Sequence, residues 1–149
     1  LLPAAFFRDD LSAAPFGLIG IEQLARRYEA SVQATALRAV DLFSSAPCML
    51  LVLHRAHKPA ERGREANSEP KLRLSWAHGS GAWPFPLRHK SIGDDSVLGS
   101  AWDQPVTAPT ADIDELLSDP VGDVELSAGR YGDTVLAIAR RPPRQRARR

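Results

Sequence analysis

The side chains that most readily hold a transition metal in this 149-residue chain are four histidines and one cysteine. His54 and His57 are the only closely spaced histidines, while His78 and His89 stand apart. Zinc sites commonly take two ligands from a short motif such as HExxH or CxxC, because one helical turn or one knuckle then sets both. Neither motif occurs in the sequence. We therefore expect surface or turn histidines, no metal site, and no cofactor in this chain.

Nucleophilic catalysis has no clear candidate either. The GxSxG pattern that places a reactive serine on a sharp turn does not occur. Cys48 precedes Met49, Leu50 and Leu51, and apolar surroundings disfavour the thiolate that reacts. We expect a buried, unreactive thiol and no catalytic residue. A single cysteine also excludes an intramolecular disulfide, which is typical of a protein in the reducing cytoplasm.

Polar side chains on one expected helix are the candidates for contact with DNA or a protein partner. They are Gln33, Thr35 and Arg38, on a helix that Ser31 can cap with its hydroxyl. A second helix just before it would complete helix-turn-helix geometry. The recognition helix carries one arginine and also one aspartate, so phosphate contacts would be weak. Packing within the protein is therefore favoured over DNA binding as the role of this helix pair.

Three helices are expected before residue 45, and they would position those polar groups. A short helix is predicted over residues 1–10, followed by a break over 12–20 that contains Pro15, Gly17 and Gly20. The two helices after the break have apolar residues at the i, i+3, i+4, i+7 spacing of amphipathic helices. Their apolar sides are Ile21, Leu24, Ala25 and Tyr28 for one helix, and Val32, Ala36, Leu37, Val40 and Phe43 for the other.

Four aromatic side chains are candidates for the wall of a pocket that binds a small-molecule effector. They are Trp76, Trp83, Phe85 and Trp102, from a part of the chain that is rich in turn residues. Large aromatic residues are also frequent in hydrophobic cores, so an aromatic core is the favoured alternative. Burial of these side chains in one place would distinguish a shared pocket from scattered core positions.

The second half of the chain predicts strands separated by turns. Residues 48–54 form an apolar run typical of a buried strand, and residues 57–70 form a polar loop. Residues 71–78 alternate, which places Leu72, Leu74 and Trp76 on one face. The remaining expected elements are a short helix capped by Ser96, a helical turn within 112–117, and a hairpin of 123–127 with 134–140 across Gly129, Tyr131 and Gly132.

The expected fold class is therefore α+β, with a helix-turn-helix-like unit at residues 1–45 and an antiparallel-sheet unit at 46–140. Six arginines lie in the last ten residues, and we expect the tail at 141–149 to be disordered. Without those six, 13 basic residues face 18 acidic ones, which argues against general nucleic-acid binding by the body of the protein. No apolar run is long enough to span a bilayer, so we expect no membrane partner.

The order of several motifs resembles the ImmA/IrrE metallopeptidase family. Leu2 and Pro3 are followed by Phe6 and Phe7, then by IEQLARRYEASVQATALR and the strand CMLLVLHR. This series is similar to the region that follows the zinc-binding helices of the family. The resemblance is direct as far as about Asp41.

Individual positions of the second and third helices carry the resemblance. Leu24, Ala25, Ser31 and Arg38 match the family pattern, while Ala30 stands where valine is commoner. Beyond residue 45 the strands, the long loop and the terminal hairpin are similar to the GAF-like C-terminal domain of the radiation-response branch. The resemblance implies a bacterial protein whose family members cut a helix-turn-helix repressor in a stress response. It also implies zinc in a part upstream of Leu1.

The resemblance implies an accessory role, because the chain contains no HExxH and would not be a peptidase alone. The leading hypothesis is a regulatory region that positions a repressor substrate or senses a small molecule for a zinc metallopeptidase. Two alternatives are a DNA-binding transcriptional regulator and a protein-interaction module without peptidase activity. Retardation of DNA in a mobility-shift assay would support the DNA-binding regulator, and capture of a protein partner would support the interaction module.

Overall fold

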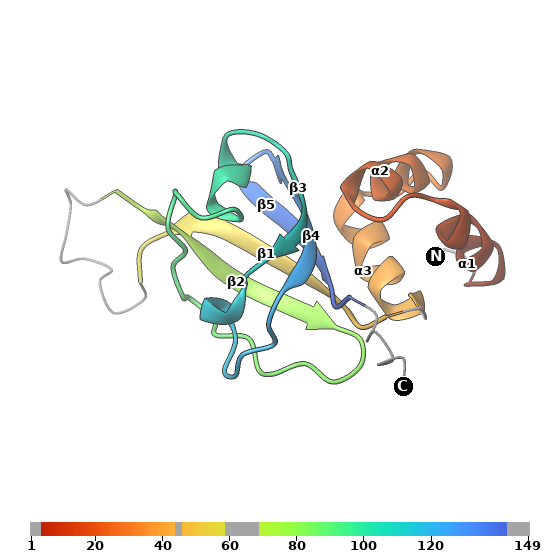
Figure 1. The fold of residues 1–149 in the computed structure, drawn as a ribbon. Coiled ribbons are helices and arrows are strands. Elements are labelled where there is room, and N and C mark those ends of the chain that lie inside the picture. The colour runs from red at the N-terminus through yellow and green to blue at the C-terminus, as the bar shows by residue number, and fades with distance from the viewer. Residues whose placement is uncertain (1–3, 44–45, 59–68, 143–149) are drawn as a thin grey trace, which may run out of the picture.

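Three helices precede a five-stranded antiparallel sheet in the computed structural model, which confirms the α+β fold class (Figure 1). The structure describes residues 4–43, 46–58 and 69–142. The helices are α1 (Ala4–Ala13), α2 (Leu18–Arg27) and α3 (Val32–Leu42). The strands are β1 (Cys48–Ala56), β2 (Lys71–Gly79), β3 (Val106–Ala111), β4 (Val124–Tyr131) and β5 (Thr134–Arg140). They lie in the order β2-β1-β5-β4-β3.

The helix boundaries follow from local contacts. Ser31 caps α3 as predicted, because its hydroxyl accepts a hydrogen bond from the N–H of Ala34 at 3.1 Å. The expected break over 12–20 is shorter, since α1 runs to Ala13 and α2 begins at Leu18. Gly20 lies inside α2, where a Cβ would come within 2.1 Å of the carbonyl oxygen of Pro15. It is a point of close approach rather than a helix breaker.

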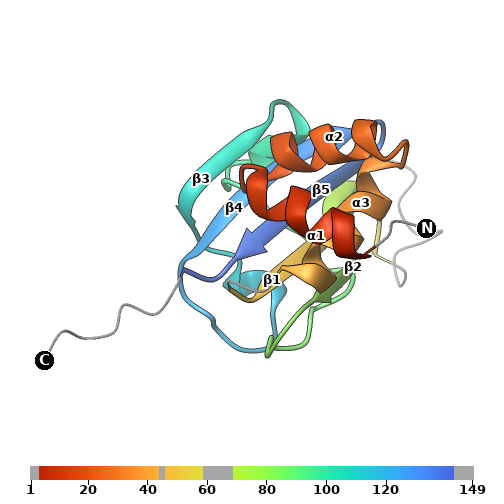
Figure 2. The ribbon, with the colours of Figure 1, turned by 90° about the vertical axis from the view of Figure 1, so that its right-hand side faces the viewer.

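The three helices cover one face of the sheet (Figure 2). Their buried side chains include Phe7 of α1, Leu24 of α2 and Val40 of α3. These residues share a hydrophobic cluster with Leu50 of β1 and Ile138 of β5. The segments predicted as a helical unit and a sheet unit therefore meet through one continuous apolar layer, which fixes the helices against the sheet.

The other face of the sheet is covered by the connections between β2 and β4. Two 3-10 helices lie there, η2 (Gly99–Trp102) and η3 (Asp114–Leu116). Leu98, Ile113 and Leu116 from these connections pack on Leu51, Leu53, Leu126 and other residues of that face. Ser96 precedes η2 and accepts a hydrogen bond from the N–H of Gly99 at 2.9 Å. Ser96 thus bonds the first residue of η2 but is not its cap, because Leu98 occupies that position without a side-chain cap hydrogen bond. The sheet is buried on both sides.

A β-bulge in β2 overturns the prediction that Leu72, Leu74 and Trp76 share a face. Leu53 of β1 pairs with Leu74, whereas Val52 pairs with Trp76, so Ser75 is an extra residue in β2. An extra residue reverses the side-chain alternation beyond it. Leu72 and Leu74 accordingly pack away from the helices, while Trp76 packs on the helix-covered face.

The strand β3 was not among the expected elements, and Pro109 lies in its middle. It is tolerated because β3 is an edge strand and its pairing with β4 is interrupted between Ala108 and Ala111. The predicted hairpin of β4 and β5 is confirmed, but β4 is longer than expected and includes Gly129 and Tyr131. Gly132 forms the turn with a φ of 66°, a conformation that glycine adopts without strain.

Several predicted segments fall partly or wholly outside the described residues. They are residues 1–3, 44–45, 59–68 of the predicted polar loop, and 143–149 of the predicted tail. Arg141, expected to begin the disordered tail, donates its N–H to the carbonyl of Pro47 at 3.0 Å. No helix within the described ranges is long and apolar enough to cross a membrane.

Candidate functional site

The four aromatic residues predicted to line one pocket lie in different places. Trp76 packs on the helix-covered face of the sheet, whereas Trp83 and Trp102 pack against the opposite cluster. Phe85 is 82% exposed to solvent. Because the sheet separates Trp76 from the other two tryptophans, the structure does not bring these side chains together as one pocket wall.

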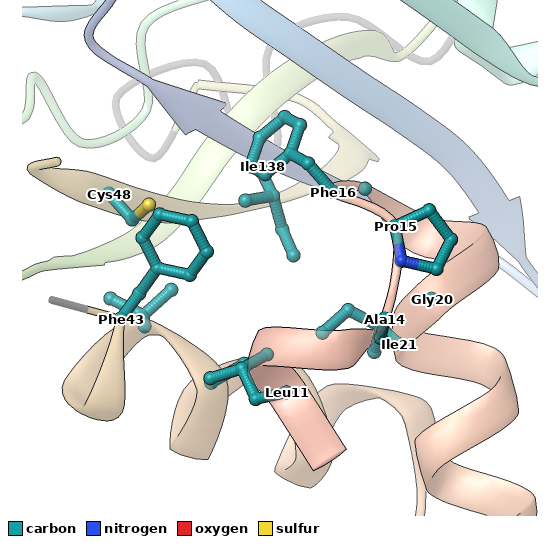
Figure 3. Close-up of a pocket in the computed structure, with 12 residues that line it drawn as sticks. Leu11, Ala14, Pro15, Phe16, Gly20, Ile21, Phe43, Cys48 and Ile138 are labelled. Carbon is teal, nitrogen blue, oxygen red and sulfur yellow. The ribbon is translucent and has the colours of Figure 1, made fainter. Parts of the chain in front are cut away.

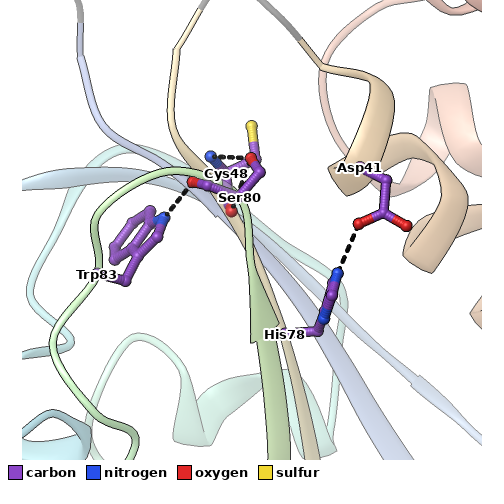
Figure 4. A network of polar contacts seen from close by, with 5 residues as sticks. All are labelled: Asp41, Cys48, His78, Ser80 and Trp83. Atoms are coloured by element: carbon purple, nitrogen blue, oxygen red, sulfur yellow. Dashed lines mark hydrogen bonds and ion pairs between the residues drawn. The ribbon is translucent and has the colours of Figure 1, made fainter.

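Trp83, which follows β2, is held by contacts within the protein. Its indole N–H donates to the carbonyl of Ser80 at 3.0 Å, and the guanidinium of Arg141 lies 4.8 Å from its ring centroid. Figure 4 shows the Ser80 hydroxyl directed at the backbone of Cys48. Trp83 therefore packs against the core cluster and also contacts Arg141, the first residue of the predicted tail.

The residues predicted to contact DNA or a partner differ in exposure. Thr35 is fully buried, and its hydroxyl donates to the carbonyl of Ser31 at 2.8 Å. Because it is buried, Thr35 is unavailable for contact with DNA or a partner. Gln33 is exposed and Arg38 is half-buried. The surface that α3 offers to a partner consequently contains only two of the three predicted groups.

Asp41 occupies the same helix and is paired with a histidine of the sheet. Its Oδ1 lies 2.6 Å from Nε2 of His78 in β2, and both side chains are partly exposed (Figure 4). A second histidine, His54, lies 2.9 Å from the hydroxyl of Thr134 through Nε2. The first contact joins α3 to β2, and the second joins β1 to β5. Within the described part of the chain, no three His, Cys, Asp or Glu side chains form a group able to hold a metal.

A hollow between the helices and the sheet is lined mainly by apolar side chains (Figure 3). Its cavity volume is about 30 Å³, which is room for about one water molecule. All three helices, the α1–α2 connection and two strands contribute to its lining. The lining residues are Leu11, Ala14, Pro15, Phe16, Gly17, Gly20, Ile21, Ala39, Val40, Phe43, Cys48 and Ile138. We call this space the helix–sheet pocket.

A more polar hollow adjoins the helix–sheet pocket and shares Leu11, Ala14, Phe16 and Phe43 with it. Arg140 lines this second hollow. Its guanidinium lies 4.0 Å from the ring centroid of Phe16 and 5.4 Å from that of Phe43.

The position of Arg140 is set by an ion pair. Its Nε donates to a carboxylate oxygen of Glu125 on β4 at 3.0 Å, and a second nitrogen of the same guanidinium contacts that oxygen. Stacking and ion pairing together hold the cation in one orientation. The helix–sheet pocket thus has an apolar interior and a charged, already paired group beside its mouth.

Cys48 faces this pocket as an unreactive thiol. It is free and 2% exposed, which confirms the prediction of a buried cysteine. Burial raises the pKa of the thiol to about 12, although the nearby Arg140 guanidinium acts in the opposite direction. A neutral thiol is compatible with an apolar occupant and does not serve as a nucleophile at neutral pH.

Sequence reasoning missed the helix–sheet pocket because its lining comes from segments that are distant along the chain. The one local signal was the connection containing Pro15, Phe16 and Gly17 between two amphipathic helices. This connection has an apolar aromatic residue where a solvent-exposed loop would be polar.

Comparison with known proteins adds no relative. The chain matches no protein-family model, and no curated protein matches it. Its function is therefore to be inferred from the helix–sheet pocket, the surfaces around it and the order of the sequence motifs.

Proposed function

We propose that this chain is an accessory, regulatory region of a zinc metallopeptidase similar to the ImmA/IrrE family, and that it senses a small apolar molecule. The observation that carries the sensing role is the helix–sheet pocket, to which all three helices and two strands contribute. The comparison with that family and with its GAF-like domain rests on the order of the sequence motifs.

Because the cavity volume of the pocket is about 30 Å³, an occupant larger than a water molecule has to move the helices away from the sheet. An occupant would contact Leu11 of α1, Ile21 of α2 and Val40 of α3, as well as Ile138 of β5. A ligand shifts a conformational equilibrium only by its differential affinity for the two states. An occupant that touches both layers meets this condition, because any movement of the helices relative to the sheet changes its contacts.

The surface of α3 supplies the link to a protein substrate. Gln33 is exposed and Arg38 is half-buried, whereas Ala39 and Val40 of the same helix are buried. A change in the buried packing of α3 is therefore transmitted to the residues offered to a repressor. The proposed sequence of events is ligand binding, a shift of α3, and altered presentation of the substrate.

Binding of an apolar probe tests the sensing role. Indole is titrated into the whole chain while methyl chemical shifts of Leu11, Ile21 and Ile138 are recorded. We expect saturable shifts in the wild-type protein. Ala39→Leu should abolish them by filling the pocket, whereas Ala34→Leu, exposed on the same helix, should leave them unchanged.

A failed substitution would be recognised by its thermal unfolding. If Ala39→Leu does not fold, Ala14→Leu at the rim of the pocket replaces it. Absence of saturable shifts in the wild type, or equal shifts in the pocket and control variants, would contradict the sensing role.

The peptidase part of the proposal has an independent test in the gene. An HExxH motif in the same reading frame, within about a hundred residues upstream of Leu1, is expected. The zinc would be held there, and a cleavage assay on a helix-turn-helix repressor would compare the parent with and without this region. An open upstream frame without the motif would overturn the metallopeptidase assignment.

A protein-interaction module is the second candidate, and two exposed apolar side chains favour it. Phe6 of α1 is 72% exposed and Ile19 of α2 is 66% exposed. Exposed large apolar residues often mark protein contacts. Phe6→Ser and Ile19→Ser should then reduce capture of a repressor or other partner while leaving indole binding unchanged.

A further inference from the structure

A second site, separate from the helix–sheet pocket, is formed by two arginines and a tryptophan. The guanidinium carbon of Arg130 lies 3.9 Å from the ring centroid of Trp102, and that of Arg55 lies 4.3 Å from it. The three residues are far apart in sequence and come from β4, β1 and η2. Each guanidinium is within cation–π distance of the same indole ring.

The sheet register brings the two arginines together. Val135 of β5 pairs with Leu53 on one side and with Arg130 on the other. Arg55 lies two residues beyond Leu53 on β1, so it projects from the same face of the sheet as Leu53 and Arg130. Trp102 packs partly buried against the end of the hydrophobic cluster on that face. The arrangement is therefore built on rigid strands.

Neither arginine is neutralised by a carboxylate in the part of the chain that the structure describes. Arg130 donates through Nε to the carbonyl of Gly132 at 2.7 Å, which fixes its orientation. Because each guanidinium lies close to one ring, the two positive charges are less than 9 Å apart, about a Debye length. Such a pair attracts a multivalent anion more strongly than either residue alone.

Both guanidinium groups keep N–H donors while they contact the indole ring. The Nε–H of Arg130 is taken by the carbonyl of Gly132, so the donors left for an acceptor are its terminal guanidinium N–H groups and the guanidinium N–H groups of Arg55. Beside Trp102 lies an open hollow of about 340 Å³, whose lining includes Arg130 and the carboxylate-bearing Asp103, while Arg55 lies outside it. Donors and space for a ligand are thus adjacent.

We infer that Arg55, Arg130 and Trp102 bind the phosphate groups of a small phosphorylated molecule. Arginine forks match phosphate oxygens in a bidentate manner, and the indole holds both forks in place. The tryptophan face is already occupied by guanidinium, so the site recognises the phosphates rather than stacking on a base. The inference does not depend on the proposed sensing of an apolar molecule, since the two sites share no residue.

Titration with inorganic pyrophosphate tests the site. The whole chain is used, and binding is followed by calorimetry and by the chemical shift of the Trp102 indole N–H. We expect saturable binding that weakens with salt. Arg55→Gln and Arg130→Gln should each lower the affinity about tenfold or more, as expected for losing a charged hydrogen-bonding group. Arg55→Lys, which keeps the charge but not the fork, should give an intermediate loss.

Two controls separate this site from general attraction of anions. Arg38→Gln removes an arginine from α3, and a variant with Arg144, Arg146, Arg148 and Arg149 changed to Gln removes charge from the chain end. Both should bind pyrophosphate as the wild type does. The inference is overturned if pyrophosphate fails to shift the Trp102 signal, or if the chain-end variant loses binding while the Arg55 and Arg130 variants retain it.

Discussion

The backbone N–H of Leu18 donates a hydrogen bond of 2.9 Å to the side-chain hydroxyl of Ser127, 109 residues further along the chain. Leu18 is the first residue of α2, and Ser127 is buried in β4. The contact satisfies a helix N-terminal donor that has no partner within the helix. The contact also fixes where α2 begins on the sheet. The backbone at Gly17 comes so close to Ser127 that a Cβ at Gly17 would lie 2.9 Å from the Cβ of Ser127.

Ser127→Ala should lower the free energy of unfolding by about 1–3 kcal/mol, because it leaves the buried N–H of Leu18 without an acceptor. Denaturation by urea measures the change. Ser12→Ala is the matched control, since that hydroxyl donates to the carbonyl of Arg8 on an exposed part of α1. The control should change stability by less than about 0.5 kcal/mol. Equal effects of the two substitutions would show that the hydrogen bond between Leu18 and Ser127 does not stabilise the protein.

The bulge at Ser75 predicts that β2 tolerates one particular deletion. Removing Ser75 makes Leu74 and Trp76 consecutive, and regular alternation then keeps them on the two faces that they already occupy. We expect a folded protein that is less stable by roughly 1–3 kcal/mol. Removing Ala77 instead would turn His78 into the core cluster and break its contact with Asp41.

The two deletions are compared by circular dichroism and by the melting temperature. Deletion of Ala77 should cost more than about 4 kcal/mol or prevent folding, because it buries an imidazole in an apolar layer. If deletion of Ser75 were the more damaging of the two, the assignment of Ser75 as the extra residue would be wrong.

Local signals made much of this fold predictable. The hydroxyl at Ser31 and the apolar stripe from Ile21 to Tyr28 identify two helices, because capping and amphipathic spacing are properties of neighbouring residues. The continuous apolar run at the start of β1 likewise identifies a strand buried on both faces, and Gly132 marks a hairpin turn. Each of these features is encoded within about ten residues.

The features that were missed depend on partners that are distant in sequence. Trp76 changes face because of a pairing between β1 and β2, and Pro109 is acceptable only because β3 is at the sheet edge. Thr35 has a polar side chain but is buried, since its hydroxyl is satisfied by the carbonyl of Ser31. The meeting of Arg55 with Arg130 on Trp102 likewise depends on strand order, which periodicity alone does not reveal.

Cys48 should react slowly with thiol reagents while the protein is folded. A pKa of about 12, against an ordinary value of 9.0, leaves roughly a thousandfold less thiolate at pH 8. Burial of the sulfur also restricts access. We expect the rate of reaction with a disulfide reagent at pH 8 to rise at least about a hundredfold when urea unfolds the chain. Comparable rates in the folded and unfolded protein would show that the thiol is accessible.

Tyr131 links the end of β4 to α2, and its ionisation should weaken the fold at alkaline pH. The phenol donates to Oε1 of Glu22 at 2.5 Å. Burial raises the pKa of Tyr131, and the hydrogen bond and negative charge of Glu22 raise it further. The folded state therefore holds this proton more tightly than the unfolded state, whose tyrosine pKa is about 10.

Because the folded-state pKa is the higher one, the resulting stability is complete below pH of about 10 and is lost as the pH rises toward the folded-state value. Tyr131→Phe removes both the hydrogen bond and the titration. At pH 7 the variant should be less stable than the wild type by about 0.5–1.5 kcal/mol. Urea denaturation from pH 8 to 11 should show this difference shrinking above pH of about 10, at up to about 1.4 kcal/mol per pH unit. Cys48 titrates in the same range but is common to both proteins, so its ordinary contribution cancels from the difference. A difference that stays constant over this range would mean that Tyr131 ionises in the folded protein as readily as in the unfolded chain.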